Sequence, residues 1–481
     1  MRRVTRALFR FPAKLLALSF ATFLTLTATA QTVTVRIDTG SSTNSEIPSD
    51  FLGLSFGMRA LLPDQEGARF FSPSNTALIQ LFQNLGLRHL RLGGTTVEAP
   101  PTTPIPDTSD IDNLFRFART AGVRKIIYSL RLLETNATLN YASTNARLAN
   151  YIWANYQPQL DCFAIGNEPD LGRVYNQDFA ITNFETYLEK WRRFAAAITN
   201  AVPRARFAGP DAASAAVGWT TRFAAEQKSS GLIKMVTGHF YVGGKGRDVA
   251  PNRGIEAMLS PAWLEANERL YQKAVLPVLA DGLAFRFTEA NDHYSGGVPD
   301  ASDTYAGALW ALDFLHWWAA HGVIGVDFHN TQWVVNDVIT RDPNGQPAIN
   351  PKGYGFRAFK LGSPGRTESL NLGKPGDLNL TAYVVNNGNL HFLTVINKEH
   401  GTKARAAKIN LPDLRVSHAR LIRLKNATGD VSAKTGVTLG DAPINAHEPW
   451  QGKWSPLAIP TSGEITFNVP PASAAIVELQ L

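Results

Sequence analysis

Eight short apolar runs recur between about residue 50 and residue 360, and they limit the folds open to this chain more than any other feature. The runs are LGLSFG, LRHLRLGG, VRKIIYSL, LDCFAIGN, RFAGPD, MVTGHFY, LAFRFTEAN and GVDFHN. Each has the length of a β-strand, and each is separated from the next by a segment long enough for a helix and its loops. Eight such β-α units in about 300 residues predict a (β/α)8 barrel of the TIM type.

Two of the intervening segments show helical periodicity clearly. Residues 183–200 read NFETYLEKWRRFAAAITN, with apolar residues at helical spacing, and residues 302–322 end on Gly322, a helix-stop signal. The second segment carries an aromatic stripe that is predicted to pack between helix and barrel: Trp310, Phe314, Trp317 and Trp318.

The pattern changes after about residue 363. The stretch LTAYVVNNGNLHFLTVINKE reads as two alternating strands around Asn387 and Gly388, a strong hairpin signal. Further short strand-like runs follow, which predicts a β-sandwich over 363–481 behind a barrel at 46–362. The run TVTVRID, within 31–45, is also strand-like, and we expect it to join that sandwich.

The first thirty residues have the layout of a secretory signal peptide. Five cations and no acid precede the apolar stretch LLALSFATFLTLT, and the small-residue motif ATA ends at Ala30. We therefore expect cleavage after Ala30 and a secreted or periplasmic protein. An uncleaved anchor is the alternative, but the apolar stretch is short for a transmembrane helix of about 20 residues.

Charge and cysteine content exclude several classes of partner. The chain has a formal net charge of +7, and five of those charges lie in the predicted signal peptide, so the remainder is near neutral. No cluster of Lys and Arg stands out along the sequence, so neither nucleic acid nor, after cleavage, a membrane is predicted as a partner. The single cysteine, Cys162, is predicted to pack as a small buried hydrophobe. Because no Cys/His ligand spacing and no nucleotide fingerprint is present, no metal or cofactor is predicted.

Two glutamates follow predicted barrel strands. Glu168 comes directly after the fourth apolar run, and Glu289 lies in the seventh. On a barrel all strand C-termini open on one face, so these carboxyl groups can converge. Two converging carboxyl groups are what glycoside hydrolysis requires, one to protonate the leaving oxygen and one to attack the anomeric carbon. We predict Glu168 as the acid/base and Glu289 as the nucleophile.

Neighbouring polar residues suit this division of labour. Asn167 can present an amide to a sugar hydroxyl. His239 and Tyr241 are two residues apart in a predicted strand, so their side chains point to the same side. A hydrogen bond from the Tyr241 hydroxyl, and a second from Arg91, would keep Glu289 ionised.

At this point the motifs resemble a known family. The sequence NEP after the fourth strand and a Glu after the seventh resemble the large clan of retaining TIM-barrel glycosidases. More narrowly, LRLGG, IGNEPD, AGPD, TEANDHYSGG and PPASAAIVEL, in this order, resemble glycoside hydrolase family 79, the β-glucuronidases and heparanases. The resemblance covers nearly the whole chain after the signal peptide, and it implies the same roles for Glu168 and Glu289.

The resemblance also implies a subsite for a substrate carboxylate. By analogy with the family, that carboxylate contacts Tyr294 and the backbone of Gly296 and Gly297. Positions that line the family's sugar subsite correspond to Asn167, His239 and Tyr241.

Three positions depart from the family pattern. Glu98 stands where the family often has Asp, and Ser295 stands where one branch has Gly. Trp333 stands where a Tyr helps to bind the substrate carboxylate, and Trp offers one N–H and no hydroxyl. Glu98 and Trp333 are therefore predicted substrate contacts whose identity bears on which sugar is bound.

The expected protein is a secreted retaining exo-β-D-glucuronidase that acts on glycans or glycosides containing glucuronic acid. Three alternatives remain open at this point. The same residues could cleave a neutral glucoside or xyloside, or cut within a chain as an endo-β-glucuronidase. A carbohydrate-binding protein without turnover is the alternative of a different class.

Overall fold

A computed structural model describes residues 30–38, 46–98, 103–134, 140–171, 181–331, 334–373, 375–412, 414–461 and 463–481. The predicted signal peptide before Ala30 and the predicted substrate contact Trp333 lie outside these residues. Within the described part of the chain, no helix has both the length and the apolar character needed to span a bilayer.

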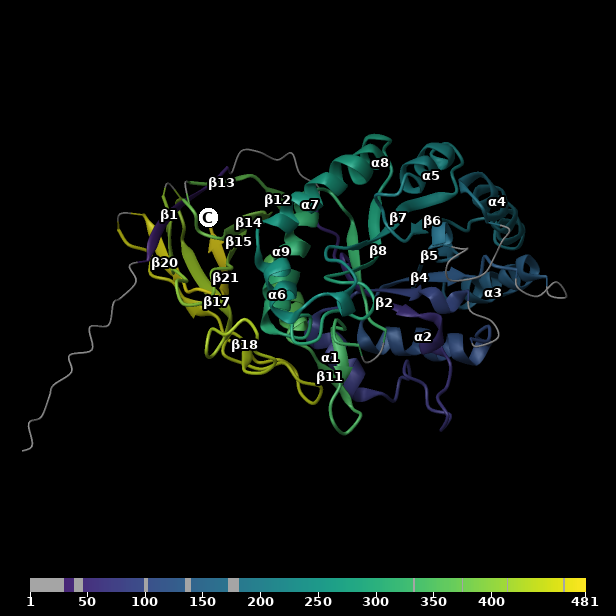
Figure 1. Ribbon diagram of the computed structural model, residues 1–481, viewed down its shortest axis with the longest axis horizontal. Coiled ribbons are helices and arrows are strands. Elements are labelled where there is room, and N and C mark those ends of the chain that lie inside the picture. The colour runs from purple at the N-terminus through teal and green to yellow at the C-terminus, as the bar shows by residue number, and fades with distance from the viewer. Residues whose placement is uncertain are drawn as a thin grey trace, which may run out of the picture.

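Eight parallel strands close into a barrel, which confirms the predicted fold (Figure 1). Each strand pairs with its neighbours in chain order, and the last pairs with the first. The barrel strands are β2 (Leu52–Gly57), β3 (His89–Gly93), β4 (Lys125–Leu130), β5 (Leu160–Ile165), β6 (Phe207–Ala212), β7 (Ile233–Tyr241), β8 (Phe285–Asn291) and β9 (Gly325–His329).

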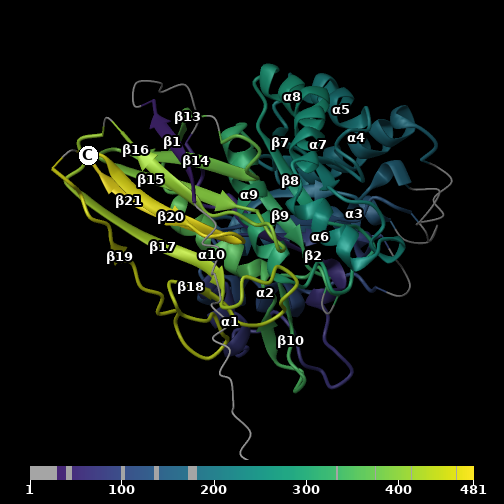
Figure 2. The same cartoon turned by 60° about the vertical axis from the view of Figure 1, so that its left-hand side comes forward.

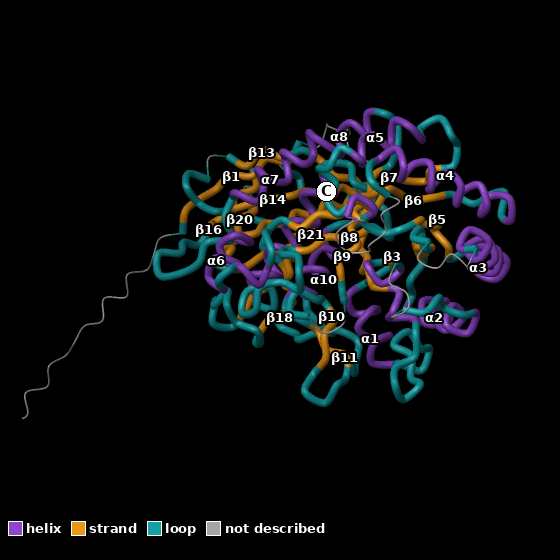
Figure 3. Tube along the Cα trace, turned by 45° about the vertical axis from the view of Figure 1, so that its right-hand side comes forward, coloured by secondary structure: helices purple, strands orange, loops and turns teal. Residues whose placement is uncertain are grey.

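Helices surround the barrel strands (Figure 3). They are α1 (Thr76–Leu85), α2 (Thr108–Ala121), α3 (Tyr141–Tyr156), α4 (Phe184–Ala201), α5 (Trp219–Gln227), α6 (Pro251–Leu259), α7 (Ala262–Leu270), α8 (Leu276–Ala280), α9 (Tyr305–Ala320) and α10 (Lys352–Gly362). The predicted helices appear as α4 and α9. A capping box between Asn183 and Thr186 starts α4, and the aromatic stripe of α9 is buried, as its spacing predicts.

Side chains alternate along each strand, so the barrel sheet has an outer and an inner face, and each face carries its own apolar cluster. One set of barrel residues packs with the surrounding helices in a large apolar cluster. A smaller separate cluster takes alternate positions of β4 to β7, which places it on the inner face of the barrel: Ile127, Cys162, Ala164, Ala208 and Met235. Cys162 is thus a buried packing residue, as its apolar neighbours predict.

The C-terminal part forms two sheets that pack as a sandwich beside the barrel (Figure 2). One sheet contains β13 (Leu370–Leu372), β1 (Gln31–Ile37), β16 (Ala407–Leu411) and β20 (Ile465–Val469). The other contains β12 (Arg366–Glu368), β14 (Leu380–Asn387), β15 (Leu390–Asn397), β21 (Ser473–Gln480), β17 (His418–Asn426), β18 (Val437–Leu439) and β19 (Ser455–Pro456). A separate hairpin pairs β10 (Ile339–Arg341) with β11 (Pro347–Ile349).

Strand β1 runs parallel to β16 and antiparallel to β13, which confirms that the N-terminal strand joins the sandwich. The predicted hairpin is also present. Its register pairs Asn387 with Leu390, so the two-residue loop is Gly388 and Asn389, one position later than the sequence signal suggested. Gly388 takes a φ of 70°, which glycine adopts without strain.

A buried charge joins the sandwich to the barrel. Asp313, on α9, accepts hydrogen bonds from the hydroxyl of Tyr383 at 2.6 Å and from Lys398 Nζ at 2.6 Å. Both donors belong to the sandwich, and Asp313 and Lys398 are fully buried. Because a buried charge without its partner is costly, this ion pair favours a single orientation of the sandwich against the barrel.

A second buried ionic group lies at the N-terminal end of the barrel, and it supports a stability prediction. Asp327 accepts from Arg286 Nε at 2.8 Å and lies 2.7 Å from Nδ1 of His89, with all three side chains buried. Asp327→Ala leaves Arg286 unpaired inside the protein, so the free energy of unfolding should fall by about 3–5 kcal/mol. Urea denaturation measures it. Glu226→Ala, which removes an exposed partner of Arg192, should cost at most about 1 kcal/mol, and equal losses would contradict the prediction.

Candidate active site

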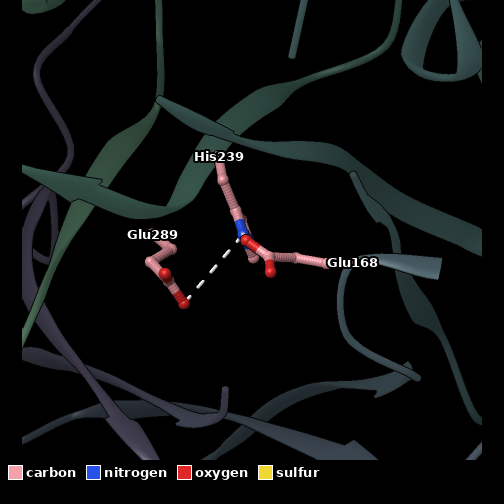
Figure 4. Close-up of side chains that lie close together, drawn as sticks. All are labelled: Glu168, His239 and Glu289. Atoms are coloured by element: carbon pink, nitrogen blue, oxygen red, sulfur yellow. Dashed lines mark hydrogen bonds and ion pairs between the residues drawn. The ribbon is translucent and has the colours of Figure 1, made fainter. Parts of the chain in front are cut away.

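The predicted catalytic glutamates meet at the C-terminal face of the barrel. Glu168 follows β5, Glu289 lies in β8, and His239 of β7 lies between them (Figure 4). One carboxylate oxygen from each glutamate and a ring nitrogen of His239 all lie within 4.8 Å of one another. Two carboxyl groups this close can both reach the same bond of a bound ligand.

The backbone at Glu168 is strained. Glu168 has a φ of 46°, and Asp211, at the end of β6, has a φ of 56°. Non-glycine residues seldom adopt this region and concentrate at functional sites. The Glu168 N–H donates to the Asp211 carbonyl oxygen at 2.9 Å, so the two strained residues support one another. Pro169 then starts a short 3-10 turn that presents the Glu168 side chain.

Both oxygens of Glu289 are held by hydrogen bonds. The Tyr241 hydroxyl donates to Oε1 at 2.6 Å, and Arg91 donates to Oε2 at 3.2 Å. These are the two donors that the sequence predicted for this carboxylate. Nδ1 of His329, at the end of β9, lies 3.3 Å from Oε2. The orientation of Glu289 is therefore determined by three different strands.

Arg91 connects Glu289 to the residues that surround Glu168. Its guanidinium donates to Glu289, to Oδ1 of Asn167 at 2.7 Å and to Oδ2 of Asp211 at 2.9 Å. The side chain is fully buried, and a Cβ added at Gly93 would lie 2.5 Å from its Cζ. Glycine in the LRLGG motif therefore leaves the space that the guanidinium occupies.

These contacts set the ionisation of the site. Burial by itself would raise the pKa of Glu289, but His329, His239 and Arg91 together hold it well below its ordinary value. Burial and the adjacent Glu289 carboxylate raise the pKa of Tyr241 well above its ordinary value, so its hydroxyl stays protonated. Glu289 is thus an ionised carboxylate with a fixed donor on each oxygen.

The second glutamate has a different environment. Oε1 of Glu168 lies 2.9 Å from Nδ1 of His239, and its side chain is 17% exposed, against 8% for Glu289. Burial opposes a charge on His239, but Glu289 and Glu168 raise the pKa of its ring above the ordinary value. Asn167 turns its amide oxygen to Arg91, which leaves its NH2 group as a donor for a bound ligand.

The predicted carboxylate subsite lies in the loop after β8. Tyr294 is 42% exposed, and its ring centroid lies 6.3 Å from that of Tyr241. Ser295, Gly296 and Gly297 have φ values of 59°, 88° and 86°. Three successive left-handed residues turn the backbone sharply, and two of them are glycines, which adopt this conformation without strain.

Buried polar contacts hold the base of this loop. Lys352 Nζ donates to Oδ1 of Asn291 at 2.6 Å and to Oδ1 of Asp292 at 3.0 Å, and all three residues are buried. Asn336 donates through Nδ2 to the carbonyl oxygen of His293 at 2.8 Å, which ties the loop after β9 to the loop after β8. The loop that carries the predicted carboxylate subsite is thus held by buried contacts at its base.

Two further predicted contacts have a different status. Glu98 is 2% exposed, and its oxygens accept backbone N–H groups of Leu132 and Leu133 at 2.9–3.2 Å. Burial raises its pKa to about 7. These contacts make Glu98 a support for the loop after β4, and its contact with substrate stays a prediction. The same holds for Trp333, which lies outside the described residues.

The sequence reasoning missed two residues that contact the catalytic pair. Asp211 accepts from Arg91 and from Thr288 Oγ1 at 2.5 Å, and His329 faces Glu289. Both residues end apolar strand runs, AGPD and DFH, in the same way as the residues that were identified. Inspection of the C-terminal end of each barrel strand for polar residues could have identified both of them.

The three central groups also have the donor types of a metal site. Glu168, His239 and Glu289 could each offer one ligand atom. Both oxygens of Glu289 already accept hydrogen bonds, one of them from a cation, Arg91. Glu289 is thus already compensated by these donors, which makes the set a poorer match for a metal ion.

A groove of about 1090 Å³ lies among loops that leave the same face of the barrel. Its walls come from the loop after β2, from the start of α2 and from the β10–β11 hairpin. They include Arg59, Phe70, Asn75 and Gln346.

The low pKa of Glu289 supports a pH prediction. If Glu289 must be ionised, activity should persist below pH 4.5, its ordinary pKa, and decline as the pH falls through the lower pKa of the folded protein. His329→Gln removes one cause of the lowering, so the acid limb of kcat/KM should move to higher pH. A profile from pH 3 to 8 measures this shift. His447→Gln, at an exposed position in the sandwich, should leave the limb in place.

No family model matches the chain, and no curated protein matches it. Solved structures resemble it over almost its whole length. A 4-O-α-L-rhamnosyl-β-D-glucuronidase from Fusarium oxysporum is 17% identical with a TM-score of 0.69, over 93% of this chain and 100% of that one. A family 51 α-L-arabinofuranosidase from Bifidobacterium longum is 16% identical with a TM-score of 0.68, over 94% and 100%.

A third similar structure is the GH39 enzyme from Xanthomonas axonopodis pv. citri, 15% identical with a TM-score of 0.59, over 94% of this chain and 98% of that one. At these identities the likeness shows the fold. The barrel and the attached β-sandwich are an architecture that this chain shares with solved glycoside hydrolases.

Proposed function

We propose that this chain is a retaining β-glycosidase and that it removes terminal β-D-glucuronic acid from glycans or glycosides. The observation that carries the proposal is the pair of carboxyl groups, with oxygens within 4.8 Å of one another. Retaining enzymes hold their two carboxyl groups about 5 Å apart, whereas inverting enzymes need about 6.5–9.5 Å to admit a water molecule. The likeness to solved glycoside hydrolases supports the same reaction class.

In the proposed mechanism, Glu289 attacks the anomeric carbon while Glu168 donates a proton to the leaving oxygen. The carbon–oxygen bond to the leaving group breaks, and a glycosyl ester forms on Glu289. Glu168, now ionised, takes a proton from water, and the resulting hydroxide adds to the anomeric carbon and releases Glu289. His239 lies within hydrogen-bond distance of Glu168 and can orient it through both steps.

Two observations favour glucuronate as the sugar. The loop of Tyr294, Ser295, Gly296 and Gly297 combines an exposed phenol with a sharply turned, glycine-rich backbone beside the nucleophile. Hydrogen bonds to an ionised carboxylate are the stronger kind, so such a loop can select a uronic acid. One similar structure was determined as a Rha-GlcA complex. We further propose that the protein is secreted after cleavage of residues 1–30, and that the groove on the same face of the barrel holds the aglycone.

The deciding experiment compares 4-nitrophenyl β-D-glucuronide with the matching glucoside and xyloside, using the chain from Gln31 onward. A preference of at least about tenfold in kcat/KM for the glucuronide supports the proposal, since one charge-assisted contact contributes about 1.5–3 kcal/mol. A preference for a neutral sugar would retain both glutamates in their roles and overturn the specificity. No hydrolysis of any of the three, with glycan binding intact, would favour a carbohydrate-binding protein.

A further inference from the structure

Basic side chains gather at the face of the barrel opposite the candidate active site. We name six of them the basal basic cluster: Arg88, Arg119, Arg124, Lys125, Arg204 and Arg206. All lie where barrel strands begin or where the preceding helix ends, whereas the candidate catalytic residues lie where strands end. A strand of five to nine residues rises about 3.3 Å per residue, so the two faces are roughly 20 Å apart.

The cluster lines two adjoining hollows. The first, of about 590 Å³, contains Arg88, Arg119, Arg124 and Lys125 with Tyr156 in its wall. The second, of about 410 Å³, shares Lys125 and also contains Arg204, Arg206 and Trp153. The Arg204 guanidinium lies 5.6 Å from the centre of the Trp153 ring. An aromatic side chain thus stands among cations in each hollow.

The cations of the cluster have no acidic partner among the described residues. Their hydrogen bonds reach neutral oxygens instead: Arg88 donates to Gly122 O at 2.7 Å, Arg124 to Ser49 Oγ at 3.4 Å, Lys125 to Pro158 O at 3.4 Å and Arg206 to Ala205 O at 3.0 Å. Burial and the nearby charge of Arg124 lower the pKa of Arg88. Like charges are therefore held together here without compensation.

Acids near the cluster already have partners. Asp161, the one acid among the described residues that lines either hollow, is paired with Lys234 and lies 3.7 Å from His89. Asp112 accepts hydrogen bonds from the hydroxyls of Tyr151 and Tyr156. The charge of the cluster is thus left for a bound anion.

We propose that the basal basic cluster is a second glycan-binding site, one that takes an acidic polysaccharide and anchors the protein to it. Uronate or sulfate groups would pair with the exposed guanidinium groups, and sugar rings would contact Tyr156 and Trp153. The choice of a glycan over another polyanion rests on the proposed function. The site itself does not, because it shares no residue with the candidate active site.

The test uses polygalacturonate, an α-linked polyuronate that a β-glycosidase does not cleave, in affinity electrophoresis with the whole chain. The variant Arg119→Glu, Arg124→Glu, Arg204→Glu alters three exposed cluster residues. The control variant Arg253→Glu, Arg269→Glu, Lys273→Glu makes the same charge change at exposed positions in and after α6 and α7. The cluster variant should bind at least about tenfold more weakly, the control as the parent does, and about 0.5 M NaCl should abolish binding.

Three results would overturn the proposal: no binding by the parent protein, equal loss in both variants, or a DNA duplex bound as tightly as polygalacturonate through the same residues. The last result would make the face a general polyanion surface. Hydrolysis of an aryl glycoside should be unchanged in the cluster variant. Binding and turnover are measured separately. A protein that binds through the cluster but does not hydrolyse any glycoside would support this inference and contradict the proposed function. A protein that hydrolyses glycosides but does not bind polygalacturonate would do the reverse.

Discussion

Glu289→Gln should lower kcat for aryl β-glycosides by about 10,000-fold or more, because an amide cannot form the glycosyl ester on which the proposed mechanism depends. Tyr241 and Arg91 each donate a hydrogen bond to one oxygen of Glu289, so the native carboxylate is both charged and correctly oriented for attack. The substitution keeps the size of the side chain. Initial rates with 4-nitrophenyl glycosides measure the loss, and thermal unfolding checks that the fold survives.

A matched control is available on the same face of the barrel. Glu98→Gln keeps an acceptor for the backbone N–H groups of Leu132 and Leu133 and should change kcat less than about tenfold, the scale of one ordinary hydrogen bond. Mass spectrometry gives an independent readout, because a 2-deoxy-2-fluoro glycoside should label the peptide that contains Glu289. A Glu289→Gln protein that retains more than a few per cent of parent activity, or a label found on another peptide, would refute the assignment.

Glu168→Ala should produce a loss that depends on the leaving group. General acid–base catalysis contributes about 100- to 10,000-fold, so glycosides with poor leaving groups should lose activity on that scale. A 2,4-dinitrophenyl glycoside needs no proton for departure, so its first step should remain fast while hydrolysis of the glycosyl ester slows. KM should therefore fall together with kcat, because the intermediate accumulates. Added azide should restore turnover by attacking the ester without a general base.

Asp170, two residues after Glu168, offers the comparison. Its carboxylate accepts the backbone N–H of Ala213 at 2.9 Å and so supports the loop. Asp170→Asn should lower activity modestly and equally for good and poor leaving groups, with no effect of azide. If the losses in Glu168→Ala were independent of the leaving group, Glu168 would be a positioning residue and another group would be the acid.

The barrel and the sandwich could be predicted because their signals are local. The alternation of apolar runs with amphipathic segments predicts the strands and helices. The rule that eight such units close into a barrel with all strand C-termini on one face then predicts their arrangement. The same rule predicts that Glu168 and Glu289 lie on one face of the barrel, where the structure places them. The hairpin at Gly388 followed from its turn residues, although its exact register depended on pairing across β14 and β15.

Other features are decided by contacts between distant segments. Arg91 of β3 reaches Glu289 of β8, Asn167 and Asp211 because closure of the barrel gathers the strand ends around one centre. His329 approaches Glu289 because β9 pairs with β8. Glu98 was predicted as a substrate contact from the family resemblance, yet backbone N–H groups of the loop after β4 occupy its oxygens. The distance between the two carboxyl groups, which separates retaining from inverting chemistry, is also a tertiary quantity.

The amino-acid sequence by itself determined which elements form, their order and which strand ends carry polar side chains, because hydrophobic periodicity and turn residues act over a few neighbouring positions. Tertiary structure decided the electrostatic surroundings of the charged side chains. It surrounds Glu289 with donors that keep it ionised. It also gathers Arg88, Arg124 and Arg204, which precede three different strands, into one basic face, although the sequence shows no basic run. Electrostatic energy depends on distance in space rather than along the chain. The sequence therefore predicted two donors to Glu289, but it revealed neither the contribution of His329 nor the basic face.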